Sequence, residues 1–291
     1  MRMEGTKIWA AMLLGFGMLV SAPAQAVILG SADGSGNTTA PTDDPGWARI
    51  GMVNGSTGVY LGDGYVLSAK HVDAGNFTLG STIYSLDSSF APQYLQTLPG
   101  MFADLVIFRV VSGPSMSLMP IYTGSAEAGK IATYVGFGLD RGTEVTGQGW
   151  LWGTTQTERW GQNVIDGTFT ISDSASHTSY ESLVSDFDRV GSGGTGLANE
   201  SAAATGDSGG ALFIKDGSIW KLAGIMTAVT ATGHSYYDNN PTLPGNQPDN
   251  LYSVRLSDYS GWILTTIPEP GSWALMVLGS GLLAARLFRK K

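Results

Sequence analysis

The chain has 291 residues and a net charge of −8, with 41 Gly, few charged residues and no Cys. This length suits one large or two modest domains, and the glycine content favours a turn-rich β protein over a helical one. The acidic charge argues against nucleic acid as a partner. The lack of Cys excludes disulfides and Cys metal sites, and three His without an HExxH motif argue against a zinc hydrolase. No metal or cofactor is expected.

The first 26 residues have the parts of a secretory signal peptide. Arg2 and Lys7 supply positive charge, an apolar run IWAAMLLGFGMLV follows, and small residues stand at Ala24 and Ala26. We therefore predict cleavage after Ala26 and export across the inner membrane. An uncleaved N-terminal anchor is the alternative, although the apolar run is short for a membrane span.

The middle of the chain consists of short apolar runs separated by Gly, Asp, Asn and Ser. Their length and their Val, Ile, Tyr and Thr content are typical of strands joined by tight turns. An all-β barrel or sandwich is therefore predicted, and residues 112–120 are a candidate crossover between two halves. The runs are ARIGMV, GVYLG, GYVLSA, LVIFRVV, KIATYVGFG, GTFTIS, ALFIK, WKLAGIMTAV and NLYSVRL.

The end of the chain, residues 267–291, has three parts: IPEP, an apolar run GSWALMVLGSGLLAA, and the basic end RLFRKK. With Pro268, Glu269 and Pro270 as its motif, this tail resembles the PEP-CTERM sorting signal of Gram-negative bacteria. The resemblance implies an exosortase as a processing partner, transient contact with the inner membrane, and delivery to the cell surface or the extracellular space. A plain C-terminal membrane anchor is the alternative.

Three motifs place chemically active side chains at the ends of predicted strands. His71 ends GYVLSAKHV, Asp104 lies in MFADLVIFRV, and Ser208 lies in AAATGDSGGALF. A serine hydroxyl needs a base to become a nucleophile, and a histidine base needs a carboxylate to orient it. Each motif alone is also explained by an ordinary turn or strand end, but the three together predict a catalytic triad.

In this order, VLSAKHV, ADLVIFRV and TGDSGGALF resemble the His, Asp and Ser motifs of the trypsin-like (chymotrypsin-fold) serine proteases. YVGFG, LAGIMT and LYSVRLSDYSGWI resemble later segments of that family, so the likeness covers most of residues 28–264. It implies a protease domain over residues 27–266, with two six-stranded antiparallel β-barrels (about 27–115 and 121–264) and a short C-terminal helix. It also implies a monomer that hydrolyses a polypeptide substrate.

The resemblance assigns a role to each catalytic residue. Ser208 attacks the substrate, His71 takes and returns the proton, and Asp104 orients His71. The backbone N–H groups of Gly206 and Ser208 are expected to form the oxyanion hole, where a residue without a side chain suits position 206.

The resemblance gives Asp207 a role in activation. In many members of the family this residue pairs with a new N-terminal amine, and cleavage after Ala26 would expose VILGS, with Val27 or Ile28 as the buried end. The alternative, which the sequence supports equally well, is that Asp207 only caps the turn.

The specificity pocket is expected to be formed by residues that precede and follow Ser208 in the sequence. No carboxylate stands there to bind Lys or Arg, and Val229 occupies a place where glycine is common in the family. We therefore expect cleavage after small apolar residues. The residues concerned are Ala202, Ala203, Ala204, Thr227, Ala228 and Val229.

Two other classes of protein fit the sequence, namely a catalytically silent trypsin-fold binding module and a structural β-rich protein of the extracellular matrix. Three tryptophans, Trp150, Trp152 and Trp160, pack in the core or form a sugar-stacking surface. His177 and His234 lie in polar stretches and are expected to be solvent-exposed loop residues.

Overall fold

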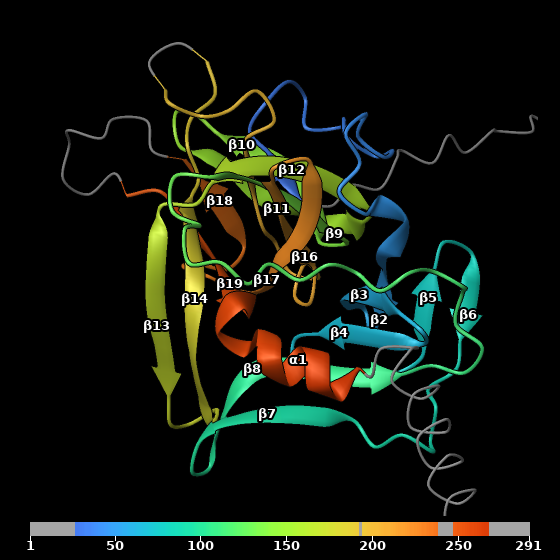
Figure 1. Cartoon of the computed structure of the whole chain (residues 1–291). Helices are drawn as coiled ribbons and strands as arrows, with labels where there is room; N and C mark the ends of the chain where they lie inside the picture. Colours follow the sequence, from blue (N-terminus) through green and yellow to red (C-terminus); the bar gives the residue numbers. More distant parts are fainter. Residues whose placement is uncertain (1–26, 192–193, 238–246, 268–291) are drawn as a thin grey trace, which may run out of the picture.

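The computed structural model describes residues 27–191, 194–237 and 247–267 (Figure 1). Within these residues the chain is mostly β-strand, with one α-helix, α1 (Ser260–Thr266), near its end. The all-β class and the short C-terminal helix are thus confirmed. The predicted signal peptide and the residues Pro268, Glu269 and Pro270 lie outside the described ranges. None of the helices described has the length and apolar character needed to span a membrane.

Seven strands form the first half of the molecule, with the hydrogen-bonded order β6-β5-β2-β3-β4-β8 and β7 on β8. Two of its hairpins have the two-residue turns Asn54-Gly55 and Asp63-Gly64, in which all four residues have positive φ. Glycine adopts this conformation freely and Asn and Asp tolerate it, so these dipeptides close hairpins tightly. The strands are β2 (Ile50–Val53), β3 (Ser56–Gly62), β4 (Tyr65–Ser68), β5 (Phe77–Leu79), β6 (Thr82–Tyr84), β7 (Gln93–Leu98) and β8 (Met101–Arg109).

Seven strands of the second half follow the order β12-β9-β16-β17-β19-β14, with β13 on β14. The two halves are joined by residues 112–120, which contain no strand, and β8 meets β14 through a parallel bridge between Phe102 and Thr178. The strands are β9 (Ile131–Gly136), β12 (Arg159–Val164), β13 (Gly167–Asp173), β14 (Thr178–Asp186), β16 (Ala211–Asp216), β17 (Ile219–Val229) and β19 (Asn250–Arg255).

Two smaller sheets lie against the second half. One contains β10 (Leu139–Val145), β11 (Gly149–Gln156) and β18 (His234–Tyr236), and the other pairs β1 (Ile28–Leu29) with β15 (Ser201–Ala202). The position of β1 differs from the expected boundary, which assigned residues 27–115 to the first half. Its apolar side chains are buried against the second half, where Ile28 packs with Phe187 and Tyr237.

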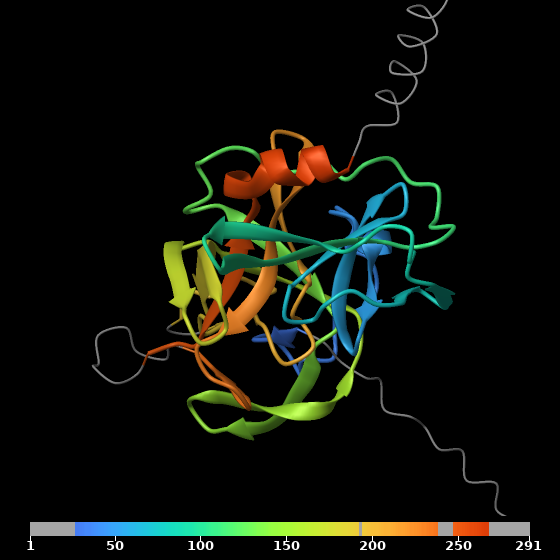
Figure 2. The same cartoon turned by 90° about the horizontal axis from the view of Figure 1, so that it is seen from below.

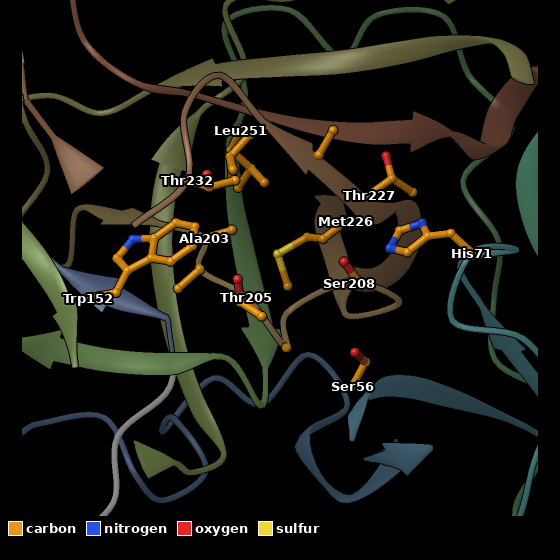
Figure 3. A pocket seen from close by; sticks show the side chains of 14 residues that line it. Ser56, His71, Trp152, Ala203, Thr205, Ser208, Met226, Thr227, Thr232 and Leu251 are labelled. Atoms are coloured by element: carbon orange, nitrogen blue, oxygen red, sulfur yellow. The ribbon is translucent and has the colours of Figure 1, made fainter. Parts of the chain in front are cut away.

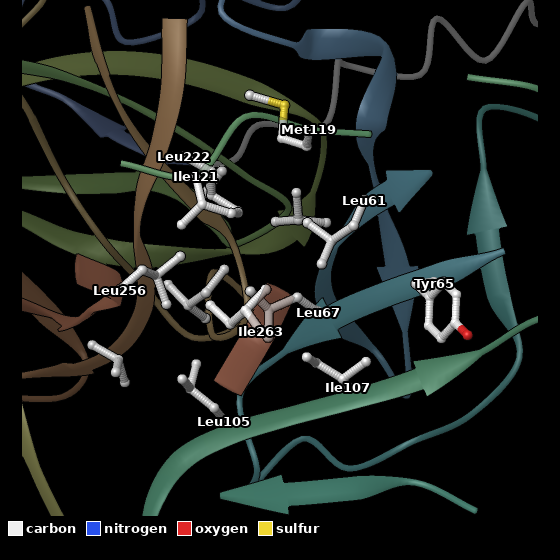
Figure 4. Close-up of a cluster of buried hydrophobic side chains, with 14 of the residues drawn as sticks. Leu61, Tyr65, Leu67, Leu105, Ile107, Met119, Ile121, Leu222, Leu256 and Ile263 are labelled. Carbon is white, nitrogen blue, oxygen red and sulfur yellow. The ribbon is translucent and has the colours of Figure 1, made fainter. Parts of the chain in front are cut away.

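The largest hydrophobic cluster lies where the halves meet (Figure 4). Leu67 and Ile107 come from the first half, Leu222 from β17, and Ile263 from α1, and each is fully or almost fully buried. Burial of apolar side chains stabilises by about 1.5 to 3 kcal/mol each, so this cluster fixes the two halves and α1 against one another. Figure 2 shows α1 lying across the strands. Residues at strand ends near this junction are therefore held in a constant relative position.

Candidate active site

His71 and Asp104 are brought together by the pairing of β4 with β8. His71 follows β4 in a short turn, Asp104 lies in β8, and Ser68 pairs with Val106 beside them. The Asp104 carboxylate accepts two hydrogen bonds from His71, one from its backbone N–H (2.9 Å) and one from ring Nδ1 (2.7 Å). Asp104 is buried and the His71 side chain is half-exposed. With the proton on Nδ1 held in this way, Nε2 is the ring atom left to act as a base.

Ser208 lies on a tight turn between β15 and β16. The Asp207 carbonyl accepts from Gly210 N–H (2.8 Å), and Gly209 N–H donates to the carbonyl of Met226 (2.8 Å). Gly209 has φ +85°, and a Cβ there would collide with the carbonyl of Thr57, so the turn requires glycine at this position. The serine itself is partly exposed.

Ser208 and His71 face the same pocket, which has a volume of about 410 Å³ (Figure 3). In the described residues no hydrogen bond joins Ser208 Oγ to His71. Such bonds in catalytic sites are often long until substrate binds. Ser208 and His71 therefore line one pocket, and Asp104 contacts His71 without lining it.

Two backbone N–H groups beside Ser208 are free to bind a negative charge. Among the described residues, the N–H groups of Gly206 and Ser208 donate to no protein acceptor, and both residues line the pocket. The carbonyl of Thr205 accepts from Leu139 N–H (2.8 Å). Because the peptide bond is trans, this bond turns the Gly206 N–H the opposite way. Gly206 has φ +97°, which favours glycine.

Asp207 is fully buried behind this turn. Its two carboxylate oxygens accept from Gly138 N–H (2.7 Å) and Ala204 N–H (2.9 Å). Burial raises the pKa of Asp207 to about 7, against the lowering effect of these bonds, of the nearby backbone N–H of Val27 and of the Arg159 charge. The carboxylate therefore links the nucleophile turn to the loop after β9 and lies near the residue that precedes β1.

A sequence model of the trypsin family matches residues 34–242, well over half of the chain. The chain belongs to the trypsin family. Family membership makes it a peptidase with the chymotrypsin-like fold, in agreement with the strands described above.

The solved structures that this trypsin-family chain resembles are distant from it. The active form of the protease Rv3671c from M. tuberculosis is 12% identical, with a TM-score of 0.45 over 73% of this chain and 76% of that one. The NS6 protease from murine norovirus 1 is 14% identical, with a TM-score of 0.43 over 75% and 93% of the two chains. Among curated proteins none matches the chain.

The pocket of this trypsin-family protease agrees in part with the predicted specificity residues. Ala203, Thr227 and Val229 line it, whereas Ala202 does not. Ala202 pairs with Ile28 and packs in a separate buried cluster. Ala202 lies in β15, which ends at this residue, and its pairing with Ile28 keeps it in that cluster, whereas Ala203 follows the strand.

Other residues of the pocket were not identified from the sequence. Trp152 from β11, Leu251 from β19 and Thr232 form the wall farthest from His71 in Figure 3. They come from segments far apart in the chain, and nothing in their local sequence marks them. Among the residues that line the pocket, His71 is the one ionisable side chain, so the lining has no carboxylate that would pair with Lys or Arg.

The three tryptophans have different surroundings. Trp150 packs against Phe187 and Tyr237 beneath the guanidinium of Arg141, which agrees with a packing role. Trp160 packs against the main cluster, and its Nε1–H donates to the carbonyl of Thr39 (3.0 Å). Trp152, the pocket residue, donates from Nε1 to Ser235 Oγ (2.9 Å).

The expectation that His234 is an exposed loop residue is wrong. His234 lies in β18, is partly buried, and its Nδ1 lies 2.8 Å from Asp249 Oδ2. Its ring stacks on Tyr236 with 3.8 Å between centroids. The partner Asp249 follows a polar stretch of sequence, so the pairing was not evident before the fold. His177 is exposed in a turn, as expected.

Proposed function

We propose that the chain is a serine endopeptidase that hydrolyses polypeptides through Ser208, His71 and Asp104. The observation that carries this proposal is the 2.7 Å contact between His71 Nδ1 and Asp104 Oδ2 at the edge of the pocket that contains Ser208. Ser208 Oγ attacks the scissile carbonyl carbon as its proton passes to His71 Nε2. The imidazolium that forms is stabilised by the Asp104 carboxylate.

The remaining steps follow from the same groups. The oxyanion of the tetrahedral intermediate is bound by the N–H groups of Gly206 and Ser208. The C–N bond then breaks, His71 gives its proton to the leaving amine, and the acyl group stays on Ser208. Water attacks this ester as His71 takes its proton, and the acid is released with Ser208 restored.

The substrate residue before the cleaved bond is an uncharged, small apolar one. An apolar lining without a carboxylate cannot offset the cost of burying Lys or Arg. Val229 lies in this lining and reduces the space available. A peptide library digested by the protein tests this preference, and cleavage mainly after Lys or Arg contradicts it.

Removal of the signal peptide activates the protease. Cleavage after Ala26 turns the backbone nitrogen of Val27, which lies near the Asp207 carboxylate and lowers its pKa, into an ammonium group. A buried carboxylate is costly unless it is paired, so this charge stabilises the ionised Asp207 and the turn in front of it. Val27 rather than Ile28 is the pairing residue, because Ile28 is engaged with Ala202 in β1 and β15.

The protease acts outside the inner membrane, at the cell surface or in the extracellular space. Support comes from the sequence of the two ends, residues 1–26 as a signal peptide and residues 267–291 as a tail for an exosortase. Mass spectrometry of the exported protein tests both ends together. A protein that begins at Met1 or ends at Lys291 contradicts the corresponding cleavage.

A fluorophosphonate probe tests the serine mechanism directly, because it reacts only with an activated serine. We expect the exported protein to be labelled at Ser208, and Ser208→Ala and His71→Ala to abolish labelling. Absence of labelling in folded, processed protein identifies instead a catalytically silent binding protein or a structural protein of the matrix.

A further inference from the structure

Thr57 lies at the start of β3, fully buried, and contacts the nucleophile turn at two points. Its hydroxyl Oγ1 donates to the carbonyl of Gly206 (2.7 Å), and its backbone N–H donates to the carbonyl of Ser208 (2.9 Å). Gly206 and Ser208 are the two residues whose own N–H groups are free. One residue of the first half therefore holds the carbonyl of each residue that supplies an N–H to the oxyanion hole.

The Thr57 hydroxyl is itself fixed from the other side. Phe137 N–H donates to Thr57 Oγ1 (2.9 Å), so the hydroxyl proton is directed at Gly206. Ser68 Oγ donates to the Thr57 carbonyl (2.8 Å), which ties Thr57 to the strand that leads to His71. Three polar groups of Thr57 are thus paired in the interior, and each loses its partner if the residue moves.

The loop after β9 completes this arrangement. Phe137, Gly138 and Leu139 use consecutive N–H groups to bond Thr57 Oγ1, the Asp207 carboxylate and the Thr205 carbonyl. Gln156 Nε2 donates to the carbonyls of Phe137 (3.1 Å) and Gly55 (2.9 Å), which holds the loop in place.

These bonds fix the peptide planes on both sides of Gly206. The plane before it, which carries the Gly206 N–H, is held by Leu139 through the Thr205 carbonyl. The plane after it is held by Thr57 through the Gly206 carbonyl and by the Asp207 N–H, which donates to the carbonyl of Ala204 (3.1 Å). Glycine has no Cβ to restrict rotation about its backbone bonds. Without the Thr57 hydroxyl, the Gly206 carbonyl loses its hydrogen-bond donor, and only the bonds of Leu139 and Asp207 remain to fix the two planes around Gly206.

We propose that Thr57 is a positioning residue for the reaction, whose hydroxyl keeps the Gly206 N–H aimed at the oxyanion. This inference rests on the proposed serine protease function. Thr57 touches neither substrate nor the reacting atoms, and it acts through Gly206. The N–H is needed most when negative charge develops on the carbonyl oxygen, so its misplacement lowers kcat more than it changes KM.

Thr57→Val tests the proposal, because valine keeps the shape of threonine and removes only the hydroxyl. Loss of an oxyanion donor costs about 10²- to 10³-fold in rate, and a donor that is misdirected part of the time costs less, so we expect kcat to fall about 10- to 100-fold with KM nearly unchanged. Thr57→Ser, which restores the hydroxyl, should recover most of kcat. The measurements use processed protein exported from cells that express the full chain, with active enzyme counted by fluorophosphonate titration.

Ser182→Ala is the matched control. Ser182 is fully buried, and its Oγ donates to the carbonyl of Phe169 at the same distance, 2.7 Å, but in β14 away from the pocket. Its loss should lower the melting temperature about as much as Thr57→Val while leaving kcat unchanged. This comparison separates positioning from a general loss of stability.

Three results overturn the inference: an unchanged kcat in Thr57→Val, a rise in KM alone, or no recovery in Thr57→Ser. A kcat lowered equally by Ser182→Ala also overturns it, since stability would then explain the effect. If the wild-type protein neither hydrolyses peptides nor reacts with the probe, the proposed function fails first. The inference about Thr57 then fails as well. The wild-type measurement distinguishes this case from a failure of the Thr57 inference alone.

Discussion

The two halves of the molecule hold their reactive groups in different ways. In the first half, His71 follows β4 and Asp104 lies within the neighbouring strand β8, and their side chains contact each other directly. In the second half, the groups are Ser208 and two backbone N–H groups on a turn, and their positions depend on buried polar neighbours such as Asp207. A side-chain pair can be altered with little effect on the backbone, whereas a turn moves when an anchor is removed. Substitutions in the His71–Asp104 pair should therefore affect mainly the chemistry, whereas substitutions in the anchors of the nucleophile turn should affect geometry and stability together.

Asp104→Asn in the first half should have the largest effect on activity. The side-chain amide of Asn presents an N–H to His71 Nδ1, which favours the tautomer that cannot accept the Ser208 proton. We expect kcat to fall about 10⁴-fold, the size of this change in the type example of the triad, with little change in melting temperature. Steady-state kinetics and thermal unfolding measure both. A large fall in melting temperature would remove the contrast between the halves.

Asp207→Asn in the second half should lower both activity and stability. The Asn side chain can accept only one of the hydrogen bonds from Gly138 and Ala204, and it offers no charge to an ammonium group at Val27. We expect kcat to fall about 10²- to 10³-fold, as when an oxyanion donor is lost, together with a lower melting temperature. Asp216→Asn, at an exposed carboxyl, is the control. Full activity of Asp207→Asn contradicts the activation proposal.

Val229→Gly should alter selectivity without weakening the nucleophile turn. The Val229 side chain forms part of the pocket wall and does not hold that turn in place. Removal of its methyl groups makes room for larger substrate residues. We expect the ratio of kcat/KM for Phe over Ala before the cleaved bond to rise about tenfold, which is typical for a change of one or two methyl groups in an apolar pocket. Paired peptide substrates measure this ratio. An unchanged ratio would place the substrate side chain elsewhere.

The smallest expected effect is on the pH dependence of stability, and it also belongs to the second half. Burial raises the pKa of Glu200 from its ordinary value near 4.5 to about 8. The folded protein therefore holds a proton that the unfolded chain releases, and the free energy of unfolding falls as pH rises from about 4.5 to about 8.

Glu200→Gln should flatten part of this decline, because an amide does not titrate. Thermal unfolding from pH 4 to pH 9 measures the slope, with Glu144→Gln at an exposed position as the control. Burial also raises the pKa of Glu158 to about 8, so part of the decline in stability with rising pH should remain in Glu200→Gln. An identical slope in wild type and Glu200→Gln contradicts the assignment.

The fold class could be predicted from the sequence because the relevant signals are local. Apolar runs and Asn-Gly or Asp-Gly turns determine the hairpins; His71 follows β4, Asp104 lies within β8 and not at its end as expected, and Ser208 precedes β16. Neighbouring strands then bring their ends together. The roles of the three residues stay predictions until the probe experiment is done.

The supporting residues could not be predicted, because they act through contacts between distant parts of the chain. Thr57 meets Gly206 across 149 positions, and a buried threonine in a strand looks like any other in the sequence. Trp152 lines the pocket from β11, which pairs with the distant strand β18. The Ala202 prediction failed because a family likeness does not say which face of a two-residue strand is buried.

The pairing of β1 with β15 sets an order of events during synthesis. Ile28 is among the first residues made after the predicted signal peptide, and its partner is Ala202. At about 5 to 20 residues per second, roughly 10 to 35 seconds pass between the synthesis of Ile28 and the synthesis of Ala202. The Asp207 anchor arrives later still. A chain interrupted at any earlier point therefore has no assembled nucleophile turn, and proteolytic activity should appear only after most of the polypeptide has been made.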